Sequence, residues 1–410
     1  MKADLDRLMA ERGLAALVVA SDEIYCPMRD YLSSGARIGG ALIVKRQGAA
    51  PVLFVNPMEV EEARVSGLTV YTFNDLGRGE LARELQGDAL AVEVEMWARA
   101  LDRVGVTGGT IGVYGTGALH RYIELLRALA ERLPAYAFAG ERGLSLFDAA
   151  YLTKDADEIA RLKSVAARTS AVARATWDFI GGHRAVNGAV VKADGAPLTI
   201  GDVKRFVRRA LLDRDLEDTN MIFAQGRDGG FPHSRGQADT PLHTGQAIVF
   251  DLFPREIGGG YHHDMTRTWC IGHAPDNVRA AYEQVLAAFE LAAAAFAEPG
   301  QPAHTLQDAV LDYFEAHGHA TGRSDPSATT GYTHSLGHGL GLNVHERPSL
   351  SHLRRDDLLQ AGSVFTIEPG LYYPDEGYGV RLEDTLYVAD DGALVTLTDF
   401  HKELVLPLRG

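Results

Sequence analysis

The segment Ala247-Ile-Val-Phe-Asp-Leu-Phe253 places a carboxylate inside an almost continuous apolar run. A run of this kind is typical of a strand that is buried on both faces. Burying an unpaired carboxylate costs several kcal/mol, on the order given by transfer experiments, or forces the group to take up a proton. Asp251 therefore constrains the fold, because the folded chain must bring a compensating partner to this strand.

A second acid, Asp264, lies in the segment Gly260-Tyr-His-His-Asp-Met-Thr-Arg-Thr268. If this segment is a strand, alternation places Asp264 on the same face as Thr266 and Thr268. A polar face of this kind is consistent with a solvated edge strand or with a site beside Asp251. The segment taken alone does not decide between them.

Three histidines, His334, His338 and His345, lie within a glycine-rich stretch of twelve residues. Glycine lets the backbone approach a site closely. Imidazole is the commonest metal ligand and the usual acid–base group near neutral pH. A single histidine is more often a hydrogen-bonded core residue than a ligand, but three in one stretch indicate a functional site.

Two further acids interrupt apolar segments later in the chain. Glu368 lies in the strand pattern Val364–Leu371, before a Pro-Gly turn, and Glu383 lies in Gly379–Thr385. Alternation puts Arg381 beside Glu383, so a simple ion pair is an alternative explanation for this acid. Buried acids that lie close together raise one another's pKa unless cations neutralise them, and about four carboxylate charges match two divalent ions. The predicted ligands of a site for two divalent ions are Asp251, Asp264, His338, Glu368 and Glu383.

Coordination by oxygen with one imidazole suits manganese, cobalt or iron, and zinc stays an alternative because availability often decides which metal is bound. We expect manganese. The sequence contains no His-Glu-x-x-His, no Gly-x-Ser-x-Gly, no phosphate-binding P-loop and no Cys-x-x-Cys pair. These absences exclude several common classes of hydrolase and metal site.

Composition and charge limit the expected partners and compartment. The chain of 410 residues is 46% hydrophobic, which is enough for a large core and favours two domains. A net charge of -15 argues against a nucleic-acid partner and favours small molecules, peptides or cations. The sequence has only two cysteines, Cys26 and Cys270, no apolar signal core and no run of about 18 apolar residues, so we expect a cytoplasmic protein without membrane contact.

The order of expected elements divides the chain near Ala149 to Lys154. Before this boundary, short apolar strands alternate with helical patterns, which indicates an α/β arrangement. A long helical pattern follows from Asp155 to about Ile180, and Thr199 with Asp202 forms a capping-box sequence ahead of the next helix. Strands flanked by helices then indicate an α+β domain. The expected strands that carry candidate ligands are Gln246–Phe253, Tyr261–Ile271, Val364–Tyr373 and Gly379–Ala389.

Taken together, these motifs resemble those of the pita-bread metallopeptidases, the superfamily of methionine aminopeptidase, aminopeptidase P and prolidase, with the metal-free creatinase as a relative. The resemblance rests on the ligand set, on the seven-residue step from His338 to His345, and on the Glu-Pro-Gly and Arg-Leu-Glu-Asp sequences. It covers nearly the whole chain. It implies a creatinase-type α/β N-terminal domain with a mixed sheet over residues 1–150, followed by an α+β pita-bread catalytic domain over residues 151–410.

The resemblance also implies how the ligands are shared between the two ions. Asp264 and Glu383 would bridge the ions. Asp251 would complete the coordination of one ion, and His338 with Glu368 that of the other. Glu368 would also act as the general base towards the water or hydroxide that the ions share.

Four further residues resemble groups of the family that face the substrate or support the ligands. His345 would steady the oxyanion or protonate the leaving nitrogen, and His334 would help it to hold the scissile group. His233, in Phe231-Pro-His-Ser, resembles a substrate-side histidine. Arg381 resembles the arginine that braces the ligand network in proline-directed members.

The creatinase-type N-terminal domain favours the branch of the superfamily that cleaves Xaa-Pro bonds. We therefore expect a homodimeric, dinuclear enzyme that cleaves short Xaa-Pro peptides through a metal-bridging hydroxide, as prolidase does. Alternatives are removal of the N-terminal residue from longer peptides, as by aminopeptidase P, and trimming from the C-terminal end. Two others are a catalytically silent peptide-binding member and creatinase-like hydrolysis without metal, both of which the complete ligand set disfavours. The sequence does not define the preferred residue before proline.

Two departures from the family pattern affect the turn between the aspartates. Phe253 occupies a position where the family commonly has glycine, and Asp264 follows Asp251 by thirteen residues, a longer interval than is usual. We expect a larger turn around Pro254 to Gly260, with more effect on the substrate pocket than on the metal site. Candidate anchors for a peptide carboxylate, each more simply explained as a surface cation, are Arg235, Arg255 and Arg347.

Overall fold

The computed structural model describes residues 4–409 of the chain. Met1–Ala3 and Gly410 lie outside the described residues. Within the described range, none of the helices is both long and apolar enough to cross a membrane.

The chain divides into two compact units. The first comprises the chain up to Ala150 together with Gly258–Gly260, and the second comprises Tyr151–Ile257 and the chain from Tyr261 onward. The candidate ligands all belong to the second unit.

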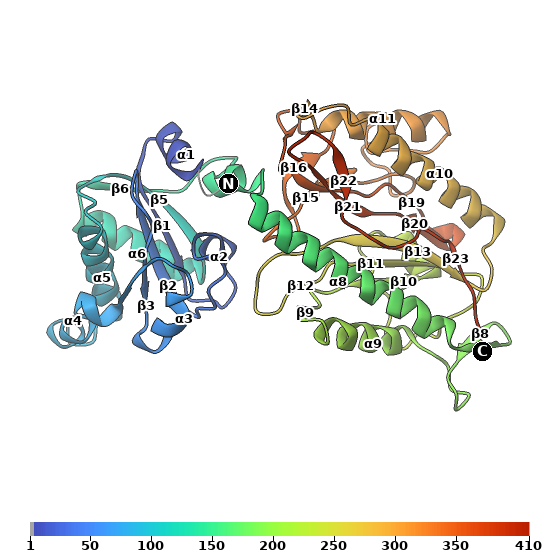
Figure 1. The fold of residues 1–410 in the computed structure, drawn as a ribbon, viewed down its shortest axis with the longest axis horizontal. Helices are drawn as coiled ribbons and strands as arrows, with labels where there is room; N and C mark the ends of the chain where they lie inside the picture. Colours follow the sequence, from blue (N-terminus) through green and yellow to red (C-terminus); the bar gives the residue numbers. More distant parts are fainter. Residues whose placement is uncertain (1–3, 410) are drawn as a thin grey trace. The chain divides into compact units, whose positions relative to one another are not determined.

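The first unit is built on a six-stranded mixed sheet in the order β4-β3-β2-β1-β5-β6 (Figure 1). Its central strand, β1 (Leu14–Ser21), is almost wholly apolar and buried, as expected for a strand covered on both faces. Ala16 and Val18 of this strand share one core cluster with Trp97 of α5 and Leu125 of α6, while α1 and α2 also contact the strand. The other strands are β2 (Ala41–Arg46), β3 (Val52–Val55), β4 (Thr69–Thr72), β5 (Gly109–Thr116) and β6 (Tyr136–Ala139).

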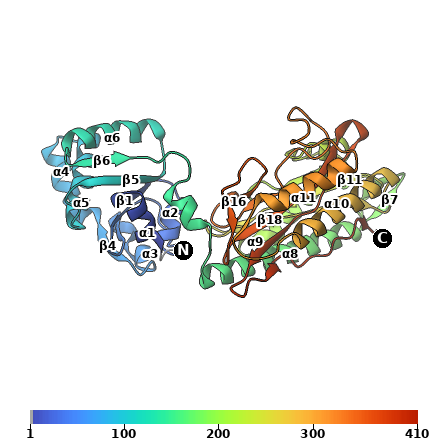
Figure 2. The same cartoon turned by 90° about the horizontal axis from the view of Figure 1, so that it is seen from above.

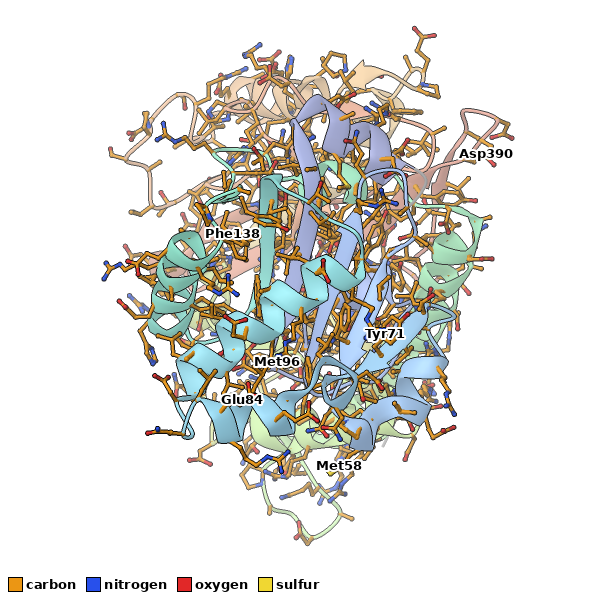
Figure 3. The ribbon with its side chains drawn as sticks, turned by 90° about the vertical axis from the view of Figure 1, so that its left-hand side faces the viewer. Met58, Tyr71, Glu84, Met96, Phe138 and Asp390 are labelled. Atoms are coloured by element: carbon orange, nitrogen blue, oxygen red, sulfur yellow. The ribbon has the colours of Figure 1, made fainter. Side chains whose placement is uncertain are left out.

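Helices enclose this sheet, as the expected alternation of strands and helices predicts. Figures 2 and 3 show the same unit from above and from the outside, with Tyr71 marking the edge strand β4 and Phe138 the edge strand β6 in Figure 3. The helices are α1 (Leu5–Glu11), α2 (Pro27–Leu32), α3 (Val60–Arg64), α4 (Arg78–Glu84), α5 (Ala89–Arg103), α6 (Leu119–Arg132) and α7 (Leu146–Tyr151), of which the last ends at the boundary of the unit.

The second unit begins with the long helix α8 (Ala156–Gly181), which starts with a capping box. The capping box predicted from Thr199 and Asp202 is confirmed, because each side chain accepts a hydrogen bond from the backbone N–H of the other residue. This reciprocal pairing satisfies amide groups that the first turn of a helix leaves without partners. The helix α9 (Ile200–Leu212) follows it.

Two sheets of the second unit carry the candidate ligands. One has four strands in the order β10-β11-β13-β23 and the other has five in the order β16-β15-β18-β21-β22. Figure 1 shows α10 and α11 above these sheets and α8 and α9 below them. Val285 of α10 and Phe314 of α11 share a core cluster with Phe365 of β18, so apolar burial holds the ligand-bearing strands in place.

The bounds of these elements follow. The helices are α10 (Asp276–Ala294) and α11 (His304–Ala316). The strands are β7 (Arg184–Val186), β8 (Ala189–Val191), β9 (Leu216–Glu217), β10 (Ile222–Gln225), β11 (Ala247–Leu252), β12 (Arg255–Glu256), β13 (Met265–Ile271), β14 (Gln301–Pro302), β15 (Gly337–Gly339), β16 (Glu346–Leu350), β17 (Leu358–Leu359), β18 (Val364–Ile367), β19 (Gly370–Tyr373), β20 (Tyr378–Arg381), β21 (Asp384–Val388), β22 (Leu394–Thr396) and β23 (Val405–Leu406).

Two expected strands are each broken at a candidate ligand. The strand expected over Val364–Tyr373 is two strands, β18 and β19, with Glu368 and Pro369 between them. Proline has no backbone N–H to continue a ladder, which accounts for the break. The strand expected over Gly379–Ala389 is also two strands, β20 and β21, with Glu383 in the gap. These acids therefore lie where the chain passes from one sheet to another.

The pairing register brings the acids of the two sheets together. β11 pairs antiparallel with β13, with Asp251 opposite Thr266. Thr266 also pairs with Glu383, which joins the four-stranded sheet to the start of β21 and explains the second break. Within the five-stranded sheet, Ile367 lies opposite Asp384, and each of these two residues is adjacent to a candidate ligand.

The longer turn expected between the two aspartates leaves this register intact. The ladder of β11 and β13 continues to Leu252 opposite Met265, so the additional residues lie beyond the paired region. Within the turn, Arg255–Glu256 form β12 and pair with β9. Gly258–Gly260 adopt φ values of 78°, 101° and 131°, a backbone region that only glycine enters without strain.

Candidate metal centre

The centre of the candidate site is a cluster of three side chains from distant segments. Asp264, His338 and Glu383 each bring one potential ligand atom to within 4.8 Å of the other two. Nε2 of His338 lies 3.7 Å from Oδ2 of Asp264 and 3.4 Å from Oε1 of Glu368. Asp264 immediately precedes β13, whereas we expected it within the strand, and His338 lies in β15.

Several carboxylate oxygens of the cluster are buried without a protein partner. Among the described residues, these orphaned atoms include Oδ1 of Asp251, Oδ1 of Asp264 and Oε1 of Glu383. Buried polar atoms are almost always hydrogen-bonded, and an ionised carboxylate accepts hydrogen bonds but donates none. A divalent cation would satisfy all of these oxygens at once, so the residues fit the metal ions that the ligand pattern predicts.

Without cations, Asp264, Glu368 and Glu383 hold their protons strongly. Burial and the charges of Glu383 and Asp251 raise the pKa of Asp264 well above its usual range, and a hydrogen bond with Asp251 adds to this effect. Burial and the neighbouring acids raise the pKa of Glu383 in the same way. Burial, opposed by the guanidinium of Arg381, raises the pKa of Glu368 to about 8. Metal binding would therefore displace protons from these groups.

Arg381 connects the acids by hydrogen bonds. Its Nη2 donates to Oδ2 of Asp251 at 2.6 Å, and its Nε donates to the hydroxyl oxygen of Thr266 at 3.1 Å. The hydroxyl of Thr266 in turn donates to Oε2 of Glu383 at 2.8 Å. The other oxygen of each of these acids is buried and has no hydrogen-bond partner. The network therefore fixes the carboxylates while leaving one oxygen of each available to a cation.

Two histidines of the glycine-rich stretch, His338 of the cluster and His345, pack against each other. The rings of His338 and His345 meet edge to face, with centroids 4.3 Å apart and planes at 87°. Burial lowers the pKa of His338 to about 3, and the neighbouring His345 adds to this shift. A neutral imidazole presents a lone pair to a cation, so the low pKa of His338 suits a metal ligand.

His334 and His233 lie close to the same region. Nε2 of His334 is 2.8 Å from the hydroxyl of Tyr372, which also accepts a hydrogen bond from Nη1 of Arg381 at 3.0 Å. Burial lowers the pKa of His334 to about 4, with smaller contributions from Arg381 and His233. Arg381 also donates to the carbonyl of Pro232, next to His233, at 3.2 Å. The arginine thus joins the acids to the candidate substrate-side histidines.

Sequence reasoning missed Tyr372 as a member of this network. The available signal was its place in the segment after Glu-Pro-Gly, where alternation puts Gly370 and Tyr372 on one face. An aromatic residue in an apolar strand is more often part of the core, and Tyr372 is indeed fully buried. Only the folded structure shows that its hydroxyl lies between Arg381 and His334.

The candidate carboxylate anchors are engaged elsewhere. Arg255 forms an ion pair with Glu217, and Arg347 forms one with Asp357. Nε of Arg235 donates to the carbonyl of Asn220 at 3.4 Å, an exposed contact. None of these interactions involves a ligand of the candidate centre.

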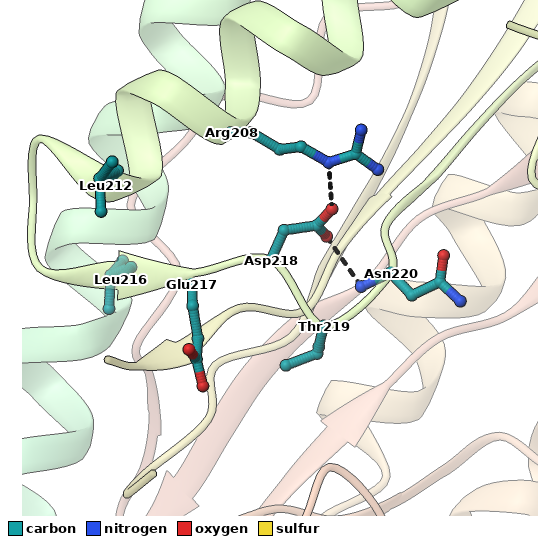
Figure 4. Close-up of a pocket in the computed structure, with 7 residues that line it drawn as sticks. All are labelled: Arg208, Leu212, Leu216, Glu217, Asp218, Thr219 and Asn220. Carbon is teal, nitrogen blue, oxygen red and sulfur yellow. Dashed lines mark hydrogen bonds and ion pairs between the residues drawn. The ribbon is translucent and has the colours of Figure 1, made fainter. Parts of the chain in front are cut away.

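A surface pocket near α9 is separate from this centre (Figure 4). Asp218 in this pocket accepts hydrogen bonds from Nε of Arg208 and from the backbone N–H of Asn220, both at 2.8 Å. The guanidinium of Arg208 therefore neutralises the carboxylate of Asp218. The pocket is lined by Arg208, Leu212, Leu216, Glu217, Asp218, Thr219 and Asn220.

Comparison with known proteins places this geometry in a family. The model of metallopeptidase family M24 matches residues 162–390, more than half of the chain. The putative dipeptidase YkvY of Bacillus subtilis is 40% identical over 188 residues, which are 46% of this chain and 47% of that protein. The Xaa-Pro dipeptidase of Pyrococcus furiosus is 36% identical over 186 residues, which are 45% and 49% of the two chains. The chain thus spans about half the length of the curated relatives that it matches.

Solved structures share the fold over nearly the whole chain. The prolidase from Pyrococcus furiosus has a TM-score of 0.71 at 23% identity, covering 97% of this chain and 99% of that one. An Xaa-Pro dipeptidase from Bacillus anthracis has a TM-score of 0.74 at 22% identity, with 99% of each chain covered. The N-terminal domain of the FACT complex subunit SPT16 from Cicer arietinum has a TM-score of 0.67 at 15% identity, covering 99% and 96%. The expected fold, an α/β unit followed by an α+β pita-bread unit, is confirmed, and the chain belongs to metallopeptidase family M24.

Proposed function

We propose that this protein is a dinuclear metallopeptidase that hydrolyses Xaa-Pro bonds in short peptides, with the specificity of a prolidase. The observation that carries the proposal is the buried cluster of acids around His338, whose oxygens without hydrogen-bond partners are suited to bind cations. A catalytically silent member of the fold would have no need to keep this costly cluster. The similarity to the Xaa-Pro dipeptidases of Pyrococcus furiosus and Pyrococcus horikoshii supports the same activity.

The proposed metal ions are two, with manganese favoured over zinc, cobalt or iron on coordination chemistry. When bound, such ions lower the pKa of a water molecule and polarise the carbonyl group under attack. The proposed ligands are Asp251, Asp264, His338, Glu368 and Glu383.

The proposed proton acceptor is Glu368. Its carboxylate lies beside the imidazole of His338, and its raised pKa of about 8 makes it a stronger base than an ordinary carboxylate. Arg381 lowers this pKa in part, so the arginine helps to keep Glu368 ionised. We assign Arg381 the further role of holding Asp251 in place through its 2.6 Å hydrogen bond.

The proposed proton donors and substrate contacts are the histidines around the cluster. His345 is exposed and packs against His338, where it would stabilise the oxyanion or deliver a proton to the leaving nitrogen. His334, held by Tyr372, and His233 would hold the scissile group. A bond before proline has no N–H for an enzyme to grip, so recognition by imidazoles that surround the bond suits such a substrate.

Hydrolysis of a small panel of peptides by metal-stripped protein, with each metal added back, tests this proposal. We expect cleavage of Ala-Pro with manganese and no cleavage without metal. Cleavage of Ala-Pro-Ala but not Ala-Pro would favour an aminopeptidase P-type activity, and cleavage of N-blocked peptides would favour C-terminal trimming. Peptide binding without cleavage by any metal-loaded sample would support a silent member, and full activity after stripping would reject the metal centre.

We also propose that the protein acts as a homodimer in the cytoplasm, with domains over residues 1–150 and 151–410. Light scattering of the purified protein would measure the oligomeric state. A monomer with full peptidase activity would reject the dimer.

A further inference from the structure

A buried ion pair lies directly beside the candidate proton donor His345. Nζ of Lys154 donates to Oε2 of Glu346, the next residue after His345, at 2.8 Å. Both side chains are only 2% exposed. The same ammonium donates to the carbonyl of Tyr151 at 2.7 Å. A charged pair this deeply buried is expensive in desolvation, so its place beside a candidate catalytic residue calls for a specific reason.

The segment that carries His345 is a loop that closes on Glu346. The ladder of β15 and β16 shifts register between His338, which pairs with Ser349, and Gly339, which pairs with Glu346, and residues 340–345 form the loop between the two strands. Oε1 of Glu346 accepts a hydrogen bond from the backbone N–H of Asn343 at 2.9 Å. A Cβ atom on Gly341 would lie 2.5 Å from Oε2 of Glu346, so the loop closes tightly around this carboxylate.

The other end of the pair is fixed to the sheet. The amide of Lys154 donates to the carbonyl of Gly362 at 2.8 Å. Gly362 has a φ of +84°, and a Cβ atom there would lie 2.8 Å from the carbonyl oxygen of Lys154. The backbone of Lys154 is therefore held close to the strand β18. Its ammonium, which bonds Glu346, connects this fixed backbone to the loop.

We propose that Lys154 is a positioning residue for the hydrolytic reaction, acting through Glu346 to hold the imidazole of His345 against His338. This inference rests on the proposed function, in which His345 contacts the reacting group. Neither Lys154 nor Glu346 belongs to the metal cluster, and the candidate reacting group next to Glu346 in the chain is His345. An error of about 1 Å in the position of a catalytic group lowers rates by roughly a hundredfold, so a loosened loop has a measurable cost.

A double-mutant cycle with Lys154→Met and His345→Ala, made in the full-length metal-loaded protein, tests this coupling. We expect Lys154→Met to lower kcat for Ala-Pro by at least about tenfold, with KM and metal content within about twofold of the wild type. In the His345→Ala background the same substitution should change kcat by less than about twofold, because the group that it positions is gone. Independent, multiplicative effects, or an equal loss of bound metal, would overturn the proposal.

Hydrogen exchange gives a readout that needs no activity. Exchange of the segment 340–346 should rise by at least about tenfold in Lys154→Met. The matched control is Lys45→Met, because Lys45 is another lysine with a buried side chain that pairs with an acid, Asp6, but it belongs to the first compact unit. This control should leave exchange of the segment 340–346 unchanged. Unchanged exchange in Lys154→Met would also overturn the proposal.

If Lys154→Met does not fold, Glu346→Gln provides the second variant. The amide oxygen of glutamine still accepts from Asn343, while the charge that pairs with Lys154 is lost. We expect the same pattern in kcat and exchange, and wild-type values in both would reject the inference. A wild-type protein that cleaves no peptide would refute the proposed function, whereas the exchange experiment would still report whether Lys154 orders the loop.

Discussion

Replacing Thr266 with valine isolates the contribution of the network that supports the metal ligands. The side chain of Thr266 is fully buried, and valine has nearly the same shape, so the substitution removes a hydroxyl without creating a large cavity. Two hydrogen bonds are lost, the 2.8 Å bond to Oε2 of Glu383 and the 3.1 Å bond from Nε of Arg381. A hydrogen bond to a charged group contributes about 1.5–3 kcal/mol, and one between neutral groups about 0.5–1.5 kcal/mol. Because the raised pKa of Glu383 keeps it protonated in the stripped protein, we expect the free energy of unfolding to fall by roughly 2–4.5 kcal/mol.

The effect of Thr266→Val on metal affinity is the more specific part of the prediction. Without the hydroxyl, Oε2 of Glu383 loses its hydrogen bond from Thr266. The carboxylate is then no longer held in the orientation that leaves Oε1 available to a cation. Loss of a group that supports a ligand weakens metal binding by about 10–100-fold, which corresponds to roughly 1.4–2.7 kcal/mol. Titration of metal-stripped protein with manganese against a competing chelator measures the affinity, and urea unfolding of the stripped protein measures the stability.

Thr268→Val is a matched control on the same strand. Thr268 is also fully buried, and its hydroxyl donates to the carbonyl of Arg381 and accepts from the amide of Arg381, both at 2.9 Å. These partners are neutral backbone groups, so we expect a stability loss of about 1–3 kcal/mol with little change in metal affinity. Wild-type manganese affinity in Thr266→Val, or an equal loss of affinity in Thr268→Val, would show that the network does not orient Glu383.

The remaining predictions concern catalysis and pH. Glu368→Ala should abolish turnover of Ala-Pro, and near-normal steady-state rates would discard Glu368 as the base. His345→Ala should lower kcat far more than it lowers metal content, and the reverse order would make it a ligand. Tyr372→Phe removes the hydroxyl between Arg381 and His334, so kcat should fall by about tenfold and the free energy of unfolding by roughly 1 kcal/mol. An unchanged kcat would show that Tyr372 contributes only to core packing. In thermal unfolding, the metal-stripped protein should lose stability as the pH rises from about 5 to 9. Folding raises the pKa of Glu368 from 4.5 to about 8. The stabilising contribution of its bound proton is therefore complete below the unfolded pKa and is lost as pH rises through the folded pKa. Added manganese should reduce this dependence, and a flat profile of the stripped protein would contradict the assignment.

The sequence predicted those parts of the fold that depend on local pattern. The apolar run around Asp251 is the buried strand β11, and the capping box of Thr199 and Asp202 begins α9 as expected. These features follow from neighbouring residues, since alternation and capping act over a few positions. The breaks at Pro369 and Glu383 depend on which sheet each segment joins, and a run of apolar residues does not predict this.

The residues that support the candidate ligands were harder to identify because their partners are distant in sequence. Tyr372 lies in an apolar strand, where an aromatic side chain is most simply explained as core. Lys154 meets Glu346 across 192 positions, so no spacing rule connects them. The candidate ligands differ in this respect, since an acid inside an apolar strand is anomalous by itself and demands compensation. Sequence reasoning therefore finds ligands more readily than the residues that hold them.

Backbone hydrogen bonds at the strand breaks tie the segments that carry candidate ligands to one another. The amide of Glu368 donates to the carbonyl of Leu336, two residues before His338, at 2.7 Å. The amide of Glu383 donates to the carbonyl of Thr266, two residues after Asp264, at 3.0 Å. Each of these acids is thus tied through its own backbone to the segment that carries another ligand. Because these backbone bonds link the ligand segments directly, the contribution of bound cations that the structure accounts for is to neutralise acids that would otherwise have to bind protons.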